Sequence, residues 1–424
     1  MSEKEIDRLA SELAKLVEIF RSGKHAGNLD FWHKGIRTFF RPYFGYQDGK
    51  VLFEGVVQSI LKLNSEMLSE ENIERQLVYE FLQNQNLSYL QQQWLYGDQL
   101  IKEAKEHVKR LVEFKACHDV YIPIVNLWHR GQAITFFGIT FIEFTGDLSN
   151  NWKKRLKSLW SEEANASVHV LAKINITGDE RRAYIQALTK VRESLDVFRA
   201  FCFPFGKYSL DWHVGIAGDI LSYHHIPISI DNSHFISYHD VGNVQVELSD
   251  HIINKYDSSI WDLLYEINIK KRQPKRLHDG IHWLAEATKP DTNNAKFIKI
   301  SIALETLLGI EPKDEDLKVR GITAMLAERA AFIAGKDYND RLTIDQKIRH
   351  FYGKRSEIVH GGGKEVLSAD IDEFGELVRR ISLAIIEGKN VQKEYIEDSQ
   401  KLETWIKEQK FTLPENKEAL NATS

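Results

Sequence analysis

The sequence has few cysteines and no long apolar run. Its two cysteines among 424 residues, Cys117 and Cys202, cannot form a disulfide framework and do not belong to a CxxC pair. No stretch of about 18 uncharged apolar residues occurs, so we expect no membrane-spanning helix. The N-terminal residues mix acids with bases and lack the apolar centre of a signal peptide. These absences predict a cytoplasmic protein rather than a secreted or membrane protein.

The motifs of several large enzyme classes are also missing. The chain contains no GxGxxG, no GxxxxGK[ST], no GxSxG and no HExxH. Their absence argues against a dinucleotide-binding enzyme, a nucleotide-driven motor, an α/β-hydrolase and a zincin protease. A net charge of -5 and a pI near 6.4 argue against a general nucleic-acid coat. Any site for a polyanion must therefore be local.

The N-terminal segment, residues 1–115, is predicted to be mainly helical. Leu9, Leu13 and Leu16 recur at three- and four-residue spacing, as one buried helix face requires. Within this segment, residues 31–46 read FWHKGIRTFFRPYFGY and interleave bases with aromatic rings. Such a stretch can stack nucleobases and hold phosphates, or it can fill a core while its basic side chains stay solvated.

Residues 116–270 are predicted to form an α+β region with a sensing or regulatory role. Residues 120–129 and 133–144 have the period of strands and are separated by a turn at 129–132. Residues 168–176 alternate in the same way and predict a third strand. Thr177 and Glu180 have the spacing of a capping box, which predicts a helix directly after that strand.

A basic segment, residues 268–280, is predicted to separate this region from the last domain. Pro274 and Gly280 interrupt the pattern, and the segment carries several basic side chains. It can be a solvated linker or an edge that holds phosphates. The candidate RNA-binding residues are Lys271, Arg272, Lys275 and Arg276, together with Arg349 and Lys354 further on.

After this segment the pattern is helical. Residues 278–390 predict a helical bundle and residues 391–424 a helical tail, so the fold class is an α+β N-terminal region followed by an all-α bundle. On one predicted helix, Arg355 lies among apolar residues that form a stripe, namely Ile344, Ile348, Phe351, Ile358 and Val359. A buried arginine is costly unless it is paired, so Arg355 needs a partner.

Two further residues support this interpretation. Arg329 lies in the apolar stripe of the preceding helix, and Glu305 in the segment ALETLL is the first carboxylate that we expect to pair with one of the two arginines. A buried Arg–Glu network that only fixes helix register is the simpler explanation, above all for Arg329. For Arg355, a functional role is the stronger hypothesis.

His360 ends the helix that carries Arg355, and Gly361 to Gly363 follow it. The helix macrodipole favours an imidazolium at this end, a form that can donate a proton. Arg355 and His360 point about 140° apart on an ideal helix, and the glycines would let the last turn unwind and bring them together. Tyr352 and Ser356 lie on the same side as His360 at four-residue steps and are expected to orient it.

These residues carry a resemblance to a known family. The R-x4-H spacing from Arg355 to His360 resembles the signature of HEPN domains, and its extended form from Tyr352 to Gly361 looks most like the Apea-like branch. The segments 303–308 and 326–333 are similar to earlier helices of that branch. The resemblance covers about residues 280–390, and no family is recognised for the first 270 residues.

The resemblance implies a helical bundle that forms a homodimer, with two motifs facing one cleft. It implies a metal-independent endoribonuclease of a toxin, abortive-infection or antiphage system, with Arg355 and His360 as the catalytic pair and Ser356 in the polar position after the arginine. Tyr352, Glu305 and Arg329 would support this pair. The expected partners are an RNA substrate, a second copy of the chain and an unknown trigger bound by the N-terminal region; no cofactor, no metal and no membrane are expected.

Two alternatives remain. A HEPN-type domain can lack catalysis and serve as an RNA-binding or protein-interaction module. A metal hydrolase can be built from the middle region, which contains His213, His224, His225, His234, His239 and His251 with Asp211 and Asp240. These residues show no local metal-binding spacing and fit ordinary sheet and loop positions better.

Overall fold

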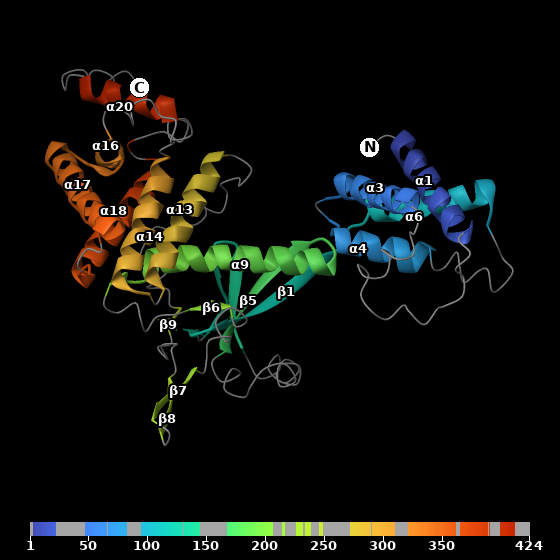
Figure 1. Ribbon diagram of the computed structural model, residues 1–424, viewed down its shortest axis with the longest axis horizontal. Helices are drawn as coiled ribbons and strands as arrows, with labels where there is room; N and C mark the ends of the chain where they lie inside the picture. Colours follow the sequence, from blue (N-terminus) through green and yellow to red (C-terminus); the bar gives the residue numbers. More distant parts are fainter. Residues whose placement is uncertain are drawn as a thin grey trace. The chain divides into compact units, whose positions relative to one another are not determined.

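The computed structural model describes residues 3–22, 47–65, 67–82, 95–129, 131–144, 168–206, 214–216, 226–231, 234–238, 246–248, 272–289, 291–309, 321–361, 365–388, 390 and 399–411. The described chain is mostly helical and contains a small antiparallel sheet (Figure 1). It divides into two compact units, residues 1–120 with 174–189, and residues 121–173 with 190–424. No helix among the described residues is long and apolar enough to cross a membrane.

The N-terminal unit is built on helices that bury one apolar core. They are α1 (Glu3–Ser22), α3 (Gln47–Leu63), α4 (Glu70–Arg75), the π-helix η2 (Gln76–Leu82) and α6 (Gly97–Val112). Leu9, Leu13 and Leu16 of α1 are fully buried and contribute to this core, as their spacing predicts. The aromatic and basic stretch at 31–46, which directly precedes α3, lies outside the described residues.

Asp179 fixes the start of α9 (Glu180–Cys202) in the N-terminal unit. Its Oδ1 accepts a hydrogen bond from the backbone N–H of Arg182 at 2.8 Å, which is the bond of an N-cap. Its Oδ2 accepts from the backbone N–H of Ser69 at 2.5 Å and from the Ser69 hydroxyl at 2.9 Å. The predicted capping box with Thr177 is therefore wrong, because Thr177 still belongs to the preceding strand and Asp179 provides the cap.

The five-stranded sheet has the order β3-β4-β5-β1-β6. Its strands are β1 (Cys117–Val125), β3 (Ile134–Phe136), β4 (Ile139–Glu143), β5 (Val168–Thr177) and β6 (Gly215–Ile216). The strand predicted at 168–176 is confirmed as β5. The single strand predicted over 133–144 is instead an antiparallel hairpin, because Phe137 and Gly138 both have positive φ, 49° and 71°, as a tight two-residue turn requires.

Shorter strands form two small ladders. The strand β2 (Leu127–Trp128) pairs in parallel with β9 (Val246–Glu247), and β7 (Ile226–Asp231) pairs antiparallel with β8 (His234–Tyr238). The ring of His129, which follows β2, is buried. Its Nδ1 lies 3.1 Å from the carbonyl oxygen of Leu248, which follows β9, so the ring bridges the ends of the two paired strands. Helix α9 covers the five-stranded sheet, and the ring of Phe198 meets Phe136 edge-on at 6.0 Å between centroids.

The C-terminal helices form a bundle in the same unit. They are α13 (Arg272–Thr288), α14 (Asn293–Leu308), α16 (Ile322–Ala334), α17 (Tyr338–Gly361) and α18 (Ser368–Glu387), with α20 (Ser399–Phe411) against α16 (Figure 1). The rings of Phe297, Phe351 and Phe374 pack together at its centre, with Phe351 stacked on Phe374 at 4.6 Å. The bundle core thus joins α14, α17 and α18.

Helix α13 begins inside the segment that the sequence predicts as a break. Pro274 lies in its first turn, where a missing N–H costs nothing. Gly280 lies within the helix at the crossing with α14, and a Cβ atom there would lie 2.5 Å from Cγ of Leu307. The glycine therefore permits close approach of two helices and does not end one.

Buried polar contacts attach α18 to the end of α9. The guanidinium of Arg379 donates to the carbonyl oxygens of Ala200 at 2.7 Å and Phe203 at 2.6 Å. Asp372 Oδ1 accepts from the backbone N–H groups of Phe205 and Gly206, at 3.2 Å and 2.6 Å. These bonds satisfy backbone groups that the end of α9 leaves unpaired, and they hold the layer of α9 against the bundle.

Candidate functional site

Helix α17 positions the residues of the R-x4-H motif. Ile344, Ile348 and Phe351 are buried with exposed fractions of 1% or less, as the predicted stripe requires. The stripe ends earlier than predicted, because Val359 is 51% exposed. Tyr352, which was expected on the outer side with His360, is buried instead. The apolar face of the helix therefore stops before the last turn.

Arg355, Glu305 and Tyr352 come together between α14 and α17. Glu305 Oε1 accepts a hydrogen bond from the Tyr352 hydroxyl at 3.0 Å and lies 3.6 Å from a terminal nitrogen of Arg355. The Tyr352 hydroxyl also lies 3.4 Å from the carbonyl oxygen of Ser301. Burial raises the pKa of Tyr352 far above its ordinary value, and the neighbouring Glu305 carboxylate raises it further. Tyr352 is thus a hydrogen-bond donor and not a source of phenolate.

The guanidinium of Arg355 is incompletely paired among the described residues. Its 3.6 Å separation from Glu305 is longer than the 2.7–2.9 Å typical of a charge-assisted hydrogen bond. Its buried Nε has no hydrogen-bond partner among the described residues. The side chain is 33% exposed. Arg355 therefore lies beside Glu305, its Nε is enclosed, and only the exposed part of its side chain can meet an anion.

His360 is exposed in the last turn of α17. The helix continues through Gly361, so the last turn does not unwind there, and Gly362 and Gly363 lie outside the described residues. Arg355 and His360 consequently point in different directions on one helix. Ser356 is exposed, and Tyr352 is bonded to Glu305, so the expectation that Tyr352 orients His360 is wrong.

Two other arginines lie at the C-terminal end of α14. Arg329 is buried and donates to the carbonyl oxygen of Leu308 at 2.9 Å, with that of Gly309 at 3.4 Å. The guanidinium of Arg276 lies against Gly309. Both place positive charge where the helix dipole is negative and where carbonyl groups lack helical partners. Arg329 therefore has a structural role as a cap, which agrees with the simpler sequence interpretation.

The candidate RNA-binding residues are placed unevenly. Arg349 donates to both carboxylate oxygens of Asp345, at 2.6 Å and 3.1 Å, which raises the pKa of Arg349. Lys354 pairs with Asp370 at 2.6 Å. Lys271 and the side chains of Arg272 and Lys275 lie outside the described residues. Arg349 and Lys354 are thus each paired with an acid, and Arg276 lies against Gly309.

A groove of about 800 Å³ lies between α16, α17 and α20. Its lining includes Arg349, Arg341, Lys336 and the aromatic ring of Tyr338, which is 77% exposed. The guanidinium of Arg341 stacks 4.6 Å from the centroid of Phe332. The groove also contains Glu328, Asp337 and Asp345, and Asp345 pairs with Arg349, so its lining has mixed charge and does not favour an anion.

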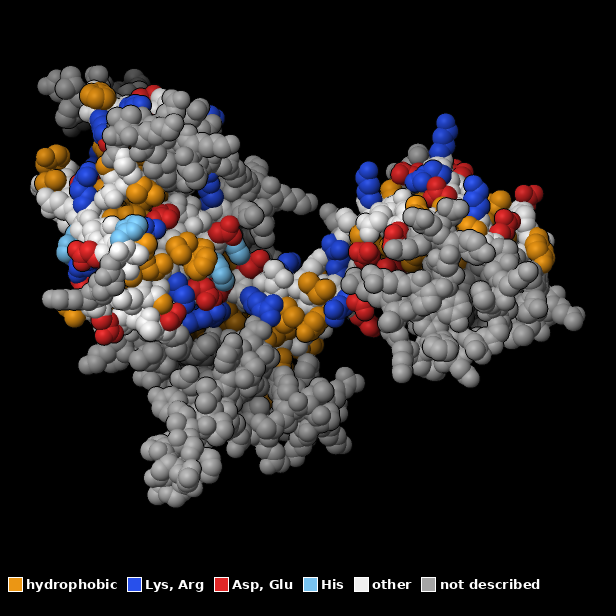
Figure 2. Space-filling model, viewed as in Figure 1, with side chains coloured by type: hydrophobic (Ala, Val, Ile, Leu, Met, Phe, Trp, Pro, Cys, Tyr) orange, Lys and Arg blue, Asp and Glu red, His pale blue; other side chains and the backbone are white. Residues whose placement is uncertain are grey.

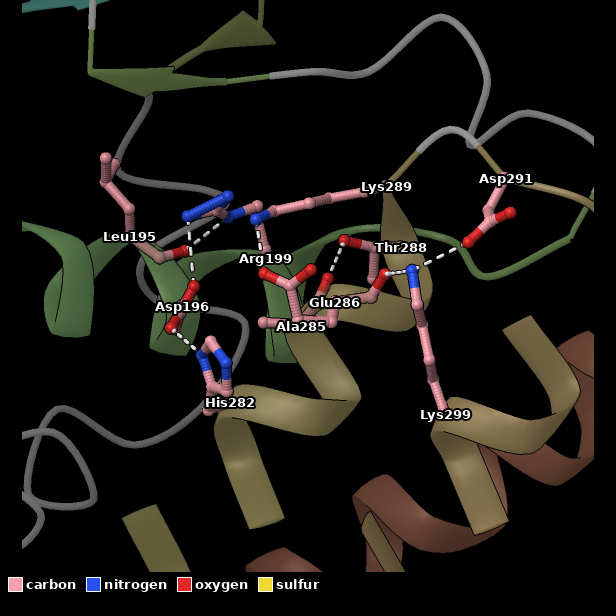
Figure 3. Close-up of polar contacts among 10 residues, drawn as sticks. All are labelled: Leu195, Asp196, Arg199, His282, Ala285, Glu286, Thr288, Lys289, Asp291 and Lys299. Carbon is pink, nitrogen blue, oxygen red and sulfur yellow. Dashed lines mark hydrogen bonds and ion pairs between the residues drawn. The ribbon is translucent and has the colours of Figure 1, made fainter. Parts of the chain in front are cut away.

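The sequence analysis missed a second polar cluster, which consists of Asp196 on α9 with His282 and Glu286 on α13 (Figure 3). The signal was available in part, because His278, His282 and Glu286 recur every four residues on one helix face. Their partner on α9 is 86 positions away in the chain and could not be identified from spacing. Of the predicted histidine cluster, His234 lies in β8 without a described side chain, and the others lie outside the described residues.

Comparison with family models, with curated proteins and with solved structures gave no match to this chain. The functional argument therefore rests on the arrangement of its own residues.

Proposed function

We propose that the protein is a metal-independent endoribonuclease of HEPN type that acts as a homodimer, in phage defence or as a toxin. The observation that carries this proposal is the state of Arg355. It is fixed by Glu305 but incompletely hydrogen-bonded, and it stands five residues before an exposed histidine at the end of α17. An arginine in this state can bind a phosphate oxygen through the part of its guanidinium that is exposed.

The chemistry requires three functions. The 2′-hydroxyl loses its proton and attacks the adjacent phosphorus, the bond from phosphorus to the 5′-oxygen breaks, and that oxygen receives a proton. The products are a 2′,3′-cyclic phosphate and a 5′-hydroxyl. A base, an acid and a cation for the charge on the phosphoryl oxygens are needed. His360 can supply the base or the acid, and Arg355 can supply the cation.

One protomer does not contain all three groups in one place. Arg355 and His360 point away from each other on α17, and each protomer has only one of each. A two-fold dimer would supply two histidines, one as base and one as acid, with two arginines around the phosphate. Dimerisation is therefore part of the proposed mechanism. Val359, which is adjacent to His360 in sequence and 51% exposed, provides apolar area for such a contact.

The ion pair with Glu305 favours a second candidate function. A guanidinium that already has a carboxylate partner can be purely structural, and the domain would then be an RNA-binding or protein-interaction module. The two functions differ in their products. A nuclease leaves shortened RNA with cyclic phosphate ends, whereas a binding module leaves the RNA intact.

The test compares the wild type with Arg355→Ala and His360→Ala in bacteria and in vitro. We expect the wild type to slow growth and fragment RNA, and each variant to lose at least about 100-fold of the cleavage rate, the usual contribution of a general acid or base. His350→Ala is the matched control, because His350 is an exposed histidine on the same helix. Cleavage is assayed in EDTA, the product ends are identified chemically, and light scattering measures the oligomeric state.

Several outcomes would contradict the proposal. RNA left intact by the wild type, both at rest and during phage infection, would exclude the nuclease and favour the binding module. Full activity of Arg355→Ala would remove the proposed role of the arginine. A strictly monomeric active enzyme would contradict the shared site.

A further inference from the structure

Three side chains of metal-ligand type converge between α9 and α13. Asp196, His282 and Glu286 each offer one donor atom, and these atoms all lie within 4.8 Å of one another (Figure 3). His282 and Glu286 are four residues apart and therefore lie on the same face of α13. The three belong to the second unit and share no side chain with the R-x4-H motif.

Asp196 is the fixed member of the group. It is buried, and its Oδ1 accepts from Arg199 at 3.0 Å while its Oδ2 lies 2.6 Å from Nδ1 of His282. Arg199 is held in turn by the carbonyl oxygen of Leu195, 3.1 Å from its Nε. A buried carboxylate with this many fixed contacts has little freedom to move. The cluster therefore has one fixed ligand, around which His282 and Glu286 can adjust.

A second imidazole and carboxylate lie one turn away on the same two helices. His278 Nε2 is 3.6 Å from Glu193 Oε1. In the space-filling view, histidine and acidic side chains lie together where α13 meets α9 (Figure 2). The interface between the two helices is thus lined by nitrogen and oxygen donors along two turns.

Two cations already balance the carboxylates. Arg199 pairs with Asp196 and Lys289 pairs with Glu286. The side chain of Arg199 is 6% exposed and cannot leave, whereas that of Lys289 is 29% exposed and can turn into water. A metal ion can therefore enter by replacing the lysine at Glu286, with Arg199 remaining as an outer partner of Asp196.

The donor set indicates the kind of ion. One imidazole nitrogen with two carboxylate oxygens combines a donor that suits Zn²⁺ and other divalent transition ions with two donors that zinc also accepts, with bonds of about 2.0–2.2 Å and a tetrahedral arrangement completed by water. Donors around such an ion lie about 3.3 Å apart, so rotation of side chains from the present arrangement is sufficient. We infer that Asp196, His282 and Glu286 bind a divalent transition metal ion that fastens α9 to α13.

The test uses the full-length protein after removal of metal with EDTA and dialysis. Calorimetric titration with Zn²⁺ and the visible absorption of added Co²⁺ are expected to show an ion bound with nitrogen and oxygen donors. His282→Ala should weaken binding by at least about 100-fold, more than the 10–100-fold loss of an outer partner. His350→Ala is the matched histidine control and should bind like the wild type. Lys289→Ala should tighten binding several-fold, because the ion no longer competes with an ammonium group.

Two results would overturn the inference. One is wild-type protein that binds neither Zn²⁺ nor Co²⁺. The other is unchanged binding by His282→Ala, which would place the ion on other histidines among the 16 in the chain. Circular dichroism checks the fold of each variant, and Glu286→Gln replaces His282→Ala if the latter is misfolded. None of these measurements uses RNA cleavage, so this inference and the proposed nuclease can fail separately.

Discussion

The two compact units bury different kinds of side chain. Among the described residues, the N-terminal unit buries apolar side chains with only His107 and Asp179 as polar exceptions, whereas the second unit also buries four basic side chains. They are Arg199, Lys296, Arg329 and Arg379. The three arginines each donate to backbone carbonyl oxygens. For Arg329 and Arg379, these acceptors lie at helix ends, so the second unit uses arginine where its helix termini are buried.

This difference predicts where each unit is vulnerable. Hydrogen exchange followed by mass spectrometry reads the peptides of the two units separately and so measures the stability of each in one sample.

The largest effect is expected for Arg379→Ala. This change leaves the carbonyl oxygens of Ala200 and Phe203 unpaired and removes a guanidinium that stacks 4.6 Å from the Phe205 ring. We expect a loss of about 3–5 kcal/mol in the free energy of unfolding, since each buried orphan acceptor costs about 1–3 kcal/mol. Denaturant unfolding measures the loss, and exchange should increase in peptides of α18 and the end of α9.

The control for Arg379→Ala is Lys347→Ala, which breaks only a surface pair with Glu373 and should cost less than about 1 kcal/mol. Equal loss of protection in peptides of α1 and α6 after Arg379→Ala would show that the units do not unfold separately.

An intermediate effect is expected from acid on the N-terminal unit. Burial, together with the charge of the neighbouring Arg110, lowers the pKa of His107 to about 4. His107 is neutral in the folded unit and becomes charged on unfolding, so its contribution is present above pH 6.5 and is lost as the pH falls from 6.5 to 4. The expected loss is about 3 kcal/mol. Urea midpoints of the wild type and His107→Met at pH 7 and pH 4.5 measure it.

For His107→Met, most of this acid-dependent loss should disappear in peptides of α6. A variant that loses as much stability between the two pH values as the wild type would assign the acid sensitivity to other groups.

The smallest effect, with the opposite sign, is expected for Lys296→Met in the second unit. Burial lowers the pKa of Lys296, so the folded state disfavours its charged form. Below the pKa that Lys296 has in the folded state, the full free-energy cost of burying its charge is present. Stability rises as the pH increases from that pKa towards the pKa of Lys296 in the unfolded chain. Methionine has a similar length and no charge, so we expect a gain of about 1 kcal/mol at pH 7 that shrinks at alkaline pH.

Melting temperatures at pH 7 and pH 10 test the prediction for Lys296→Met. A marked loss of stability at pH 7 would mean that the bonds of the ammonium group outweigh the cost of its burial. All four buried basic side chains of the second unit would then stabilise it, in contrast to the apolar core of the N-terminal unit.

Local patterns predicted much of the secondary structure. The alternation over 168–176 identified β5, the spacing in α1 identified its buried face, and the stripe on α17 identified Arg355 as a residue that needs a partner. The same reasoning named Glu305 as the first candidate partner, and the structure brings Glu305 and Arg355 together. These features depend on residues within one or two helical turns, or on the general cost of a buried charge.

Other features depend on contacts that no local pattern contains. Thr177 and Asp179 are both good capping residues, and the choice between them follows from Ser69, which is 110 positions away. The position of Tyr352 follows from Glu305 on another helix. The hairpin at Phe137 requires a non-glycine residue with positive φ, which no local sequence pattern predicts. The sequence therefore predicted elements better than their terminal contacts.

Gly280 has a consequence for sequence variation under selection. A glycine within a helix costs about 1 kcal/mol relative to alanine, so helix propensity alone would favour its replacement. At this crossing, however, a methyl group would meet Leu307 of α14, two residues after Glu305. A side chain at 280 would displace the helix that carries the partner of Arg355. In a library selected for a folded protein, position 280 should therefore remain glycine while other helical positions on the surface vary.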